Sequence, residues 1–102
     1  MVFITTYLRC DMWILKKTSQ FKRDLKRIMG QADKLRALDS VLTALANTGV
    51  VPAEYNPHPL VGKWANYMEC HIKGDFLLIW YDKQEGVISL VRLGSHSELF
   101  GK

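Results

Sequence analysis

The residue types best suited to chemistry gather in the C-terminal half of the chain. A strand-like run at residues 67–72 alternates in polarity, which places Tyr67, Glu69 and His71 on one face, and Asp75 follows just past a tight turn. Imidazole titrates near ~6.5, and a neighbouring carboxylate orients its ring, so this grouping suits proton transfer. The same residues are also compatible with an ordinary solvated strand that carries one surface histidine.

Two further histidines occupy positions that composition does not explain. His58 lies between Pro57 and Pro59, which restrict the backbone on both sides. Its side chain is therefore either aimed at a site or part of a rigid surface turn. His96 directly follows the last strand-like run, where it is either a site residue or part of a helix cap or tail.

The elements that must position these side chains can be read from hydrophobic periodicity. Residues 18–29 and 33–47 are apolar at helical spacing, and Gly30 and Gly49 suit the two helix ends. Thr18 or Ser19 can cap the first helix. The two segments predict an antiparallel helical hairpin. Its apolar stripes are formed by Phe21, Leu25, Ile28 and Met29 and by Leu35, Leu38, Leu42 and Leu45.

The remainder of the chain predicts a loop followed by a small sheet. Residues 50–64 contain three prolines and Gly62, so we expect a long ordered loop without regular structure. Residues 67–72, 75–81 and 87–93 predict an antiparallel meander in which 76–81 is central, and residues 13–16 add an edge strand. The fold class is therefore α+β: a helical hairpin packed on a small antiparallel sheet, in the order strand, helix, helix, three strands and a short C-terminal helical turn.

Length and composition bound the other properties. A chain of 102 residues with 48% hydrophobic content suits one domain, which we place at 12–102, with residues 1–11 as an N-terminal extension without assigned function. The longest apolar run, 76–81, is too short for a membrane span, so we expect a soluble cytoplasmic protein without a membrane partner. Cys10 and Cys70 fit no zinc pattern and are expected to be free thiols.

The net charge of +4 is unevenly distributed. Residues 1–51 carry nine Lys and Arg against four Asp and Glu, whereas residues 52–102 carry five against six. Basic clustering of this kind indicates attraction to a polyanion such as nucleic acid, although a charged helix face is often only solvated. The candidate RNA- or ribosome-binding residues are Lys16, Lys17, Lys22, Arg23, Lys26 and Arg27.

Four sequence blocks carry a family resemblance. They are HPLVGKW at 58–64, ECH at 69–71, GDFLLIW at 74–80 and RLGSHSELF at 92–100, with a weaker match in QFKRDLKR at 20–27. In order and spacing these blocks resemble the YafQ-like branch of the RelE/ParE toxin superfamily. The resemblance covers about residues 13–101.

The resemblance implies a single RelE-like toxin domain, the toxin of a type II toxin-antitoxin system. It implies an endoribonuclease that cleaves mRNA on the ribosome and is neutralised by a cognate antitoxin protein, with DNA contacted only indirectly through the antitoxin complex. Glu69 stands where the best-known member has Asp, and its extra methylene shifts the carboxylate. The family's other functional positions fall on His58, His71, Asp75, His96, Arg92 and Phe100.

The implied mechanism is attack by the RNA's own 2′-hydroxyl, with no metal and no cofactor. His71 and His96 are the expected acid/base pair, and Arg92 is the expected cation on the phosphate. His58 contributes to phosphate binding or proton transfer, Glu69 and Asp75 orient the histidines, and Phe100 stacks on a base. Two other functions stay open: a gyrase-inhibiting toxin of the ParE type, and a non-enzymatic RNA- or ribosome-binding module.

Overall fold

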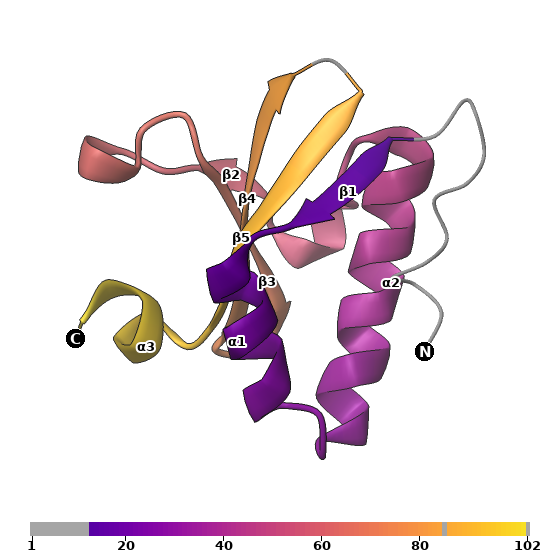
Figure 1. The fold of residues 1–102 in the computed structure, drawn as a ribbon, viewed down its shortest axis with the longest axis vertical. Coiled ribbons are helices and arrows are strands. Elements are labelled where there is room, and N and C mark those ends of the chain that lie inside the picture. Colours follow the sequence, from indigo (N-terminus) through magenta and orange to yellow (C-terminus); the bar gives the residue numbers. More distant parts are fainter. Residues whose placement is uncertain (1–12, 85, 102) are drawn as a thin grey trace.

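The structure, a computed structural model, describes residues 13–84 and 86–101, except for the side chains of residues 83 and 84. The predicted extension at 1–11, with Cys10, lies outside the described residues. The elements, shown in Figure 1, are β1 (Ile14–Lys17), α1 (Ser19–Arg27), α2 (Ala32–Thr48), η2 (Ala53–Tyr55), β2 (His58–Pro59), η3 (Gly62–Trp64), β3 (Met68–Lys73), β4 (Phe76–Gln84), β5 (Val87–Gly94) and α3 (His96–Phe100).

The sheet has five strands in the order β1-β5-β4-β3-β2. The predicted central strand, now β4, and the predicted edge strand, now β1, are both confirmed. The expectation of a purely antiparallel sheet is wrong, because β1 runs parallel to β5. Parallel neighbours need a long connection, and here both helices and three strands lie between β1 and β5 in the chain.

The helix ends follow the capping residues. Thr18 is the N-cap of α1 and its hydroxyl accepts a hydrogen bond from the backbone N–H of Phe21, while Gly49 ends α2 with φ of 76°. The expected apolar stripe of α1 is wrong at Met29, which lies beyond the helix and is 53% exposed. Asp24 instead takes a buried position on this helix.

The prediction that residues 50–64 lack regular structure is also wrong. The segment contains two short 3-10 helices, η2 and η3, and the two-residue strand β2. In β2, His58 pairs with Glu69 and Pro59 pairs with Met68 of β3. Proline is tolerated here because β2 is an edge strand. No further strand lies on its outer side, so the backbone N–H that proline lacks is not needed for a hydrogen bond there.

The two faces of the sheet carry two separate apolar clusters. On one face, α1 and α2 cover the main core, which contains Leu78 and Trp80 of β4. On the other face, Leu77 and Ile79 of β4 pack against Leu99 of α3 and the partly buried residues Leu60, Trp64, Tyr67, Val91 and Phe100. Figure 1 shows α3 and η3 together on this second side, away from α2. The candidate site forms there.

Candidate active site

The first half of the site is built around Glu69 on β3. Strand alternation places Glu69 and His71 on one face, and the register of β2 sets His58 directly opposite Glu69. Glu69 Oε1 lies 3.0 Å from His58 Nε2 and 3.7 Å from His71 Nε2. The Glu69 side chain is only 3% exposed, whereas the two imidazoles are 38% and 37% exposed. One buried carboxylate oxygen therefore serves two accessible histidines.

The other carboxylate oxygen of this residue, Glu69 Oε2, is buried and has no hydrogen-bond partner among the described residues. A buried acceptor without a donor is costly, so such an atom requires an explanation. It is satisfied if an ordered water, a bound hydroxyl or a metal ion reaches it. Such an atom fits a site that binds a ligand.

The second half of the site joins the β3–β4 turn to α3. His96 Nδ1 lies 2.7 Å from Asp75 Oδ1, and the backbone N–H of His96 donates to the same oxygen at 3.2 Å. These hydrogen bonds, from the backbone first and the ring second, hold the pKa of Asp75 below its usual value. The anionic carboxylate fixes the proton on Nδ1 and leaves Nε2 of His96 for chemistry.

Four rings connect the two halves in a row. The centroid of His71 is 6.1 Å from that of His58 and 5.9 Å from that of His96, and Phe100 lies 5.9 Å beyond His96. The structure thus brings together six of the seven predicted site residues, from four different segments. The six are His58, Glu69, His71, Asp75, His96 and Phe100.

The seventh predicted site residue, Arg92, is not a free cation, because it forms an ion pair with the buried carboxylate of Asp24. Its Nε donates to Asp24 Oδ2 at 2.8 Å and its Nη2 donates to Asp24 Oδ1 at 3.3 Å. Asp24 is 1% exposed and also accepts the backbone N–H of Leu93 at 2.9 Å. Burial by itself raises the pKa of this carboxyl, but the hydrogen bonds from Arg92 and Leu93 outweigh it, so the pKa is lowered.

Sequence reasoning missed Asp24. A signal was present, because Asp24 lies three residues after Phe21 and four before Ile28, on the inward stripe of an otherwise basic helix. An acid at such a position needs a buried cation or donors as partners. Helical periodicity cannot identify those partners, because Arg92 and Leu93 lie 68 and 69 residues away along the chain.

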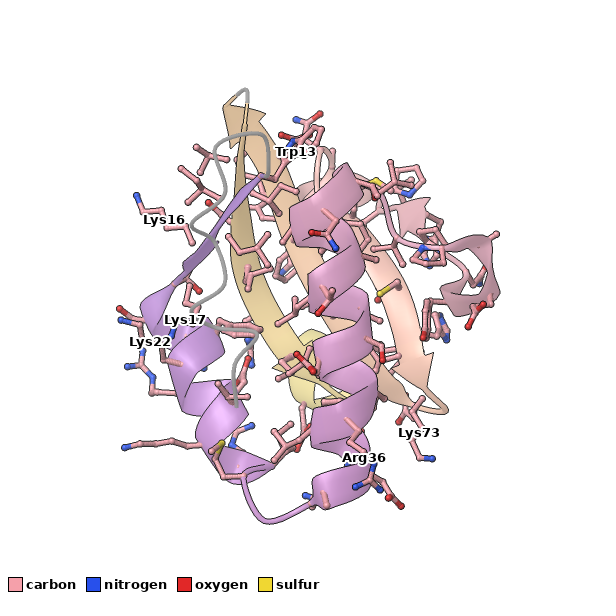
Figure 2. All side chains as sticks on the ribbon, turned by 90° about the vertical axis from the view of Figure 1, so that its right-hand side faces the viewer. Trp13, Lys16, Lys17, Lys22, Arg36 and Lys73 are labelled. Atoms are coloured by element: carbon pink, nitrogen blue, oxygen red, sulfur yellow. The ribbon has the colours of Figure 1, made fainter. Side chains whose placement is uncertain are left out.

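Two of the predicted RNA-binding residues, Lys16 and Lys17, lie on the edge strand opposite to the one that carries His58, and the other four lie on α1. β1 and β2 form the two edges, and Figure 2 shows Lys16, Lys17 and Lys22 projecting from β1 and the start of α1. Lys22, Arg23, Lys26 and Arg27 are all exposed. Arg27 differs from the rest because it lies 3.7 Å from Asp24 and 3.9 Å from Glu98 of α3.

Two other features bear on which chemistry the chain supports. Cys70 is buried and free, and burial first and the Glu69 charge second raise the pKa of its thiol to about 12, which rules out a thiolate nucleophile at neutral pH. His58, Glu69 and His71 offer ligand atoms within 4.8 Å of one another, a donor set that suits a transition metal.

None of the described helices is long and apolar enough to cross a membrane.

The mRNA interferase toxin YafQ of Escherichia coli strain K12 is 31% identical to this chain over 88 residues, which cover 85% of this chain and 95% of that protein. A metal-bound toxin from Helicobacter pylori superposes with a TM-score of 0.76 at 38% identity, covering 87% of this chain and 100% of that one. The E. coli DinJ-YafQ toxin-antitoxin complex matches with a TM-score of 0.74 at 30% identity, covering 85% and 96%. The family described as the bacterial toxin YafQ of type II toxin-antitoxin systems matches residues 14–101. The chain therefore belongs to the YafQ family of bacterial toxins.

Proposed function

We propose that the protein is an endoribonuclease that cleaves mRNA on the ribosome, as the toxin of a toxin-antitoxin pair. The observation that carries the proposal is the row of three accessible histidines on one face of the sheet, each within 3.7 Å of a carboxylate oxygen. RNA cleavage by its own 2′-hydroxyl needs one group that accepts a proton and another that donates one. The mRNA interferase activity named for the E. coli relative supports the same reaction.

In the proposed mechanism, His71 takes the proton of the 2′-hydroxyl as that oxygen attacks the adjacent phosphorus. His96 gives a proton from Nε2 to the leaving 5′-oxygen, because the Asp75 carboxylate on Nδ1 orients the ring with Nε2 free for the reaction. The products are a 2′,3′-cyclic phosphate and a 5′-hydroxyl. Phe100, next in the row to His96, stacks on a base that flanks the scissile bond.

His58 suits a third role, that of a cation near the phosphate. Its Nδ1 lies 3.2 Å from the carbonyl oxygen of Pro59, and its Nε2 lies 3.0 Å from Glu69 Oε1. Both ring nitrogens therefore face acceptor oxygens, which fixes the orientation of the ring. In its protonated form, the ring would supply positive charge to the non-bridging phosphate oxygens.

A translation extract with a defined mRNA tests the proposal. We expect cleavage at mapped positions, 5′-hydroxyl ends, and a loss of about 10²- to 10⁴-fold in the cleavage rate for His71→Gln, the usual contribution of acid/base catalysis. Circular dichroism of the variant checks that the fold is kept. Inhibition of gyrase without RNA cleavage would support the ParE-type alternative, and translation arrest with intact mRNA would support a binding module.

The proposed protein partner is a cognate antitoxin, as in the DinJ-YafQ complex of E. coli. We propose that it covers or displaces α3, a five-residue helix at the C-terminal end of the described chain. This helix is held by Leu99, by Phe100 and by the hydrogen bonds between His96 and Asp75. Hydrogen exchange on the free and bound protein measures whether the helix is covered or displaced. Unchanged protection in α3, in α1 and in the loop that carries His58 on adding a neutralising partner would contradict it.

A metal ion is a second candidate ligand of the same site. The donor set of His58, Glu69 and His71 fits such an ion, since Glu69 Oε2 has no partner among the described residues and a relative from H. pylori has been solved in metal-bound form. An ion held by these side chains would occupy the lone pairs that proton transfer requires. We therefore propose that copper or zinc inhibits cleavage reversibly. Addition of metal to the chelator-treated protein, with Glu69→Gln as the weak-binding variant, measures binding by calorimetry and cleavage in parallel.

A further inference from the structure

The Asp24 carboxylate is the most fully bonded buried acid among the described residues, and the reaction proposed above does not use it. It accepts hydrogen bonds from Arg92 Nε, Arg92 Nη2, the Leu93 backbone N–H and, at 3.3 Å, Gln20 Nε2. Both its oxygens are engaged, and its side chain is 0% exposed. A buried carboxylate with this many donors is held in a fixed position.

Asp24 belongs to a segment that covers an open edge of the sheet. β1 pairs only with Val87 to Leu90, so the last residues of β5 have no neighbouring strand on that side. α1 takes its place: the Thr18 hydroxyl donates to the carbonyl of Val91 at 3.2 Å, and Asp24 accepts the N–H of Leu93. The backbone just before Gly94, Ser95 and His96 is thereby attached to α1.

Arg92 starts from the face of the sheet that carries the histidines. It lies opposite Ile79 in the β4–β5 register, and cross-strand partners project from the same face. Ile79 belongs to the small apolar cluster with Leu99 and Phe100, beneath α3. Arg92 therefore leaves the backbone on the face of the sheet that carries the histidines, and its ion pair with Asp24 draws the guanidinium toward the edge of that face. The Arg92 side chain is 20% exposed.

The ion pair uses only part of the binding capacity of the guanidinium. Of its five N–H donors, Asp24 accepts two, on the Nε and Nη2 side, so three remain for another anion. A planar guanidinium with one edge anchored presents its other edge in a fixed orientation, which suits the two oxygens of a phosphate. The anchor removes rotational freedom that a free arginine would lose on binding.

We propose that Asp24 is a positioning residue, which holds Arg92 in place for contact with the scissile phosphate of the RNA. The inference rests on the function proposed above and assigns to α1 a part in the reaction besides attraction of RNA. Asp24 touches no reacting atom in this scheme. Its effect on cleavage passes through Arg92 and disappears when Arg92 is absent.

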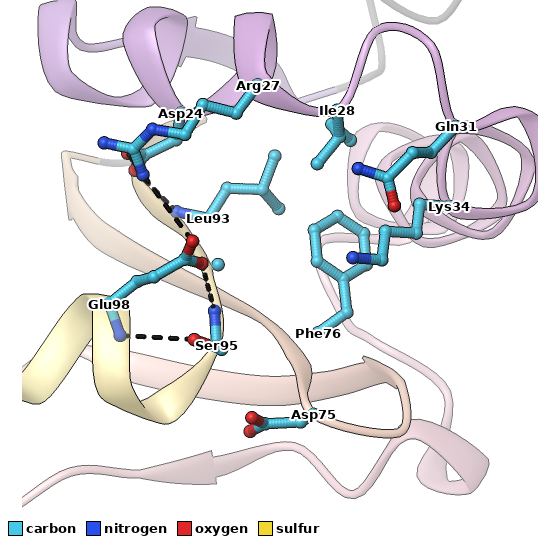
Figure 3. Close-up of a pocket in the computed structure, with 11 residues that line it drawn as sticks. Asp24, Arg27, Ile28, Gln31, Lys34, Asp75, Phe76, Leu93, Ser95 and Glu98 are labelled. Carbon is cyan, nitrogen blue, oxygen red and sulfur yellow. Dashed lines mark hydrogen bonds and ion pairs between the residues drawn. The ribbon is translucent and has the colours of Figure 1, made fainter. Parts of the chain in front are cut away.

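A hollow next to the ion pair makes this dependence accessible to chemical rescue. A cavity of about 290 Å³ is lined by Asp24, Arg27, Asp75 and Glu98, among others (Figure 3). The cavity is large enough to admit a guanidinium ion as far as Asp24, one of its lining residues, and Arg92→Ala leaves that carboxylate without its guanidinium partner. A guanidinium ion from solution can then occupy the vacated position, held by the same carboxylate.

The test compares four proteins: the wild type, Asp24→Asn, Arg92→Ala and the double variant. We expect Asp24→Asn to lower kcat/KM by about 10- to 100-fold, the usual penalty for a misplaced group, with part of the loss in kcat and part in KM. We expect millimolar guanidinium to restore cleavage to Arg92→Ala but not to the double variant. Asp24→Glu, which keeps the charge, should retain more activity than Asp24→Asn.

Asp33→Asn is the matched control, because Asp33 also pairs with an arginine, Arg36, but on the exposed surface of α2. It should cleave like the wild type. Thermal unfolding of every variant separates loss of fold from loss of positioning, and assays are run below each transition. Wild-type kcat/KM in a folded Asp24→Asn protein, or equal rescue with and without Asp24, would overturn the inference.

Binding of a 2′-O-methyl RNA, which cannot be cleaved, gives a readout that does not depend on catalysis. If the wild type does not cleave mRNA, the proposed function is wrong. The binding measurement then tests by itself whether Asp24 positions Arg92 for contact with a phosphate. Non-additive losses of affinity in the double variant support anchoring of a phosphate-binding Arg92. Additive losses, or no loss in either single variant, contradict it.

Discussion

Removal of one hydroxyl group tests whether α3 is held in place by its cap. Ser95 is the N-cap of this helix, and its Oγ accepts the backbone N–H of Glu98 at 3.2 Å. In return, the Glu98 carboxylate accepts the backbone N–H of Ser95 at 2.8 Å, which completes a capping box. A helix of five residues does not persist by propensity alone, so Ser95→Ala should weaken the segment that carries His96.

The size of the effect follows from what remains in place. Loss of an N-cap side chain costs about 1 kcal/mol, a factor of about five in the equilibrium between the docked and undocked helix. Leu99 stays buried at 6% exposure, and Phe100 keeps its edge contact with Trp64 at 5.9 Å between centroids. The freed N–H of Glu98 reaches water because the residue is exposed, so no buried donor is left unpaired. The helix should therefore loosen without detaching.

Amide hydrogen exchange measures the weakened helix directly. The N–H of Leu99 donates to the carbonyl of Ser95 at 2.9 Å, so its protection reports the docked state. We expect protection of Leu99 to fall about fivefold in Ser95→Ala, with kcat for RNA cleavage falling by no more than the same factor. Ser97→Ala is the matched control, because Ser97 is exposed and lies in the same helix but is not its cap.

Unchanged protection at Leu99 in Ser95→Ala would refute this reasoning, because the cap would then contribute nothing to docking. Equal losses in Ser95→Ala and Ser97→Ala would refute it as well, since the effect would be one of helix composition and not of the cap. In either case the burial of Leu99 would be the main restraint on α3.

Three further predictions concern activity, affinity and pH. Expression without a partner should arrest growth, and His96→Ala should abolish the arrest while the protein stays folded, because the His96 side chain is 53% exposed. Continued growth arrest by the folded variant would show that His96 is not part of the active site. Charge reversal at the exposed Lys22 and Lys26 should weaken ribosome binding and its salt dependence at a stability cost under about 0.5 kcal/mol each, measured by salt titration and thermal unfolding. Because the folded-state pKa of Asp24 lies below 3.8, its stabilising effect is present above that value and is lost as pH falls through the folded pKa. The acid side of the thermal stability profile should therefore be shallower in Asp24→Asn, and an identical slope would contradict the assignment.

Much of the fold could be predicted because it depends on local patterns. The helical spacing at Leu38, Leu42 and Leu45 and the left-handed cap at Gly49 are properties of neighbouring residues, and all four lie where the pattern indicated. The central place of β4 followed from its being apolar on both faces. The parallel pairing of β1 with β5 and the formation of β2 were missed, because strand partners are chosen between distant segments.

The candidate site divides in the same way. By itself, the sequence determined that Glu69 and His71 share a strand face and that Asp75 follows a turn, because side-chain direction in a strand depends only on the alternation of residues. Tertiary structure alone decided that His58 lies against Glu69, that His96 meets Asp75, and that Arg92 is bound by Asp24. These contacts join residues 11, 21 and 68 positions apart along the chain. A hydrogen bond requires donor and acceptor within about 3 Å, and across such separations only the packing of helices on the sheet brings them that close.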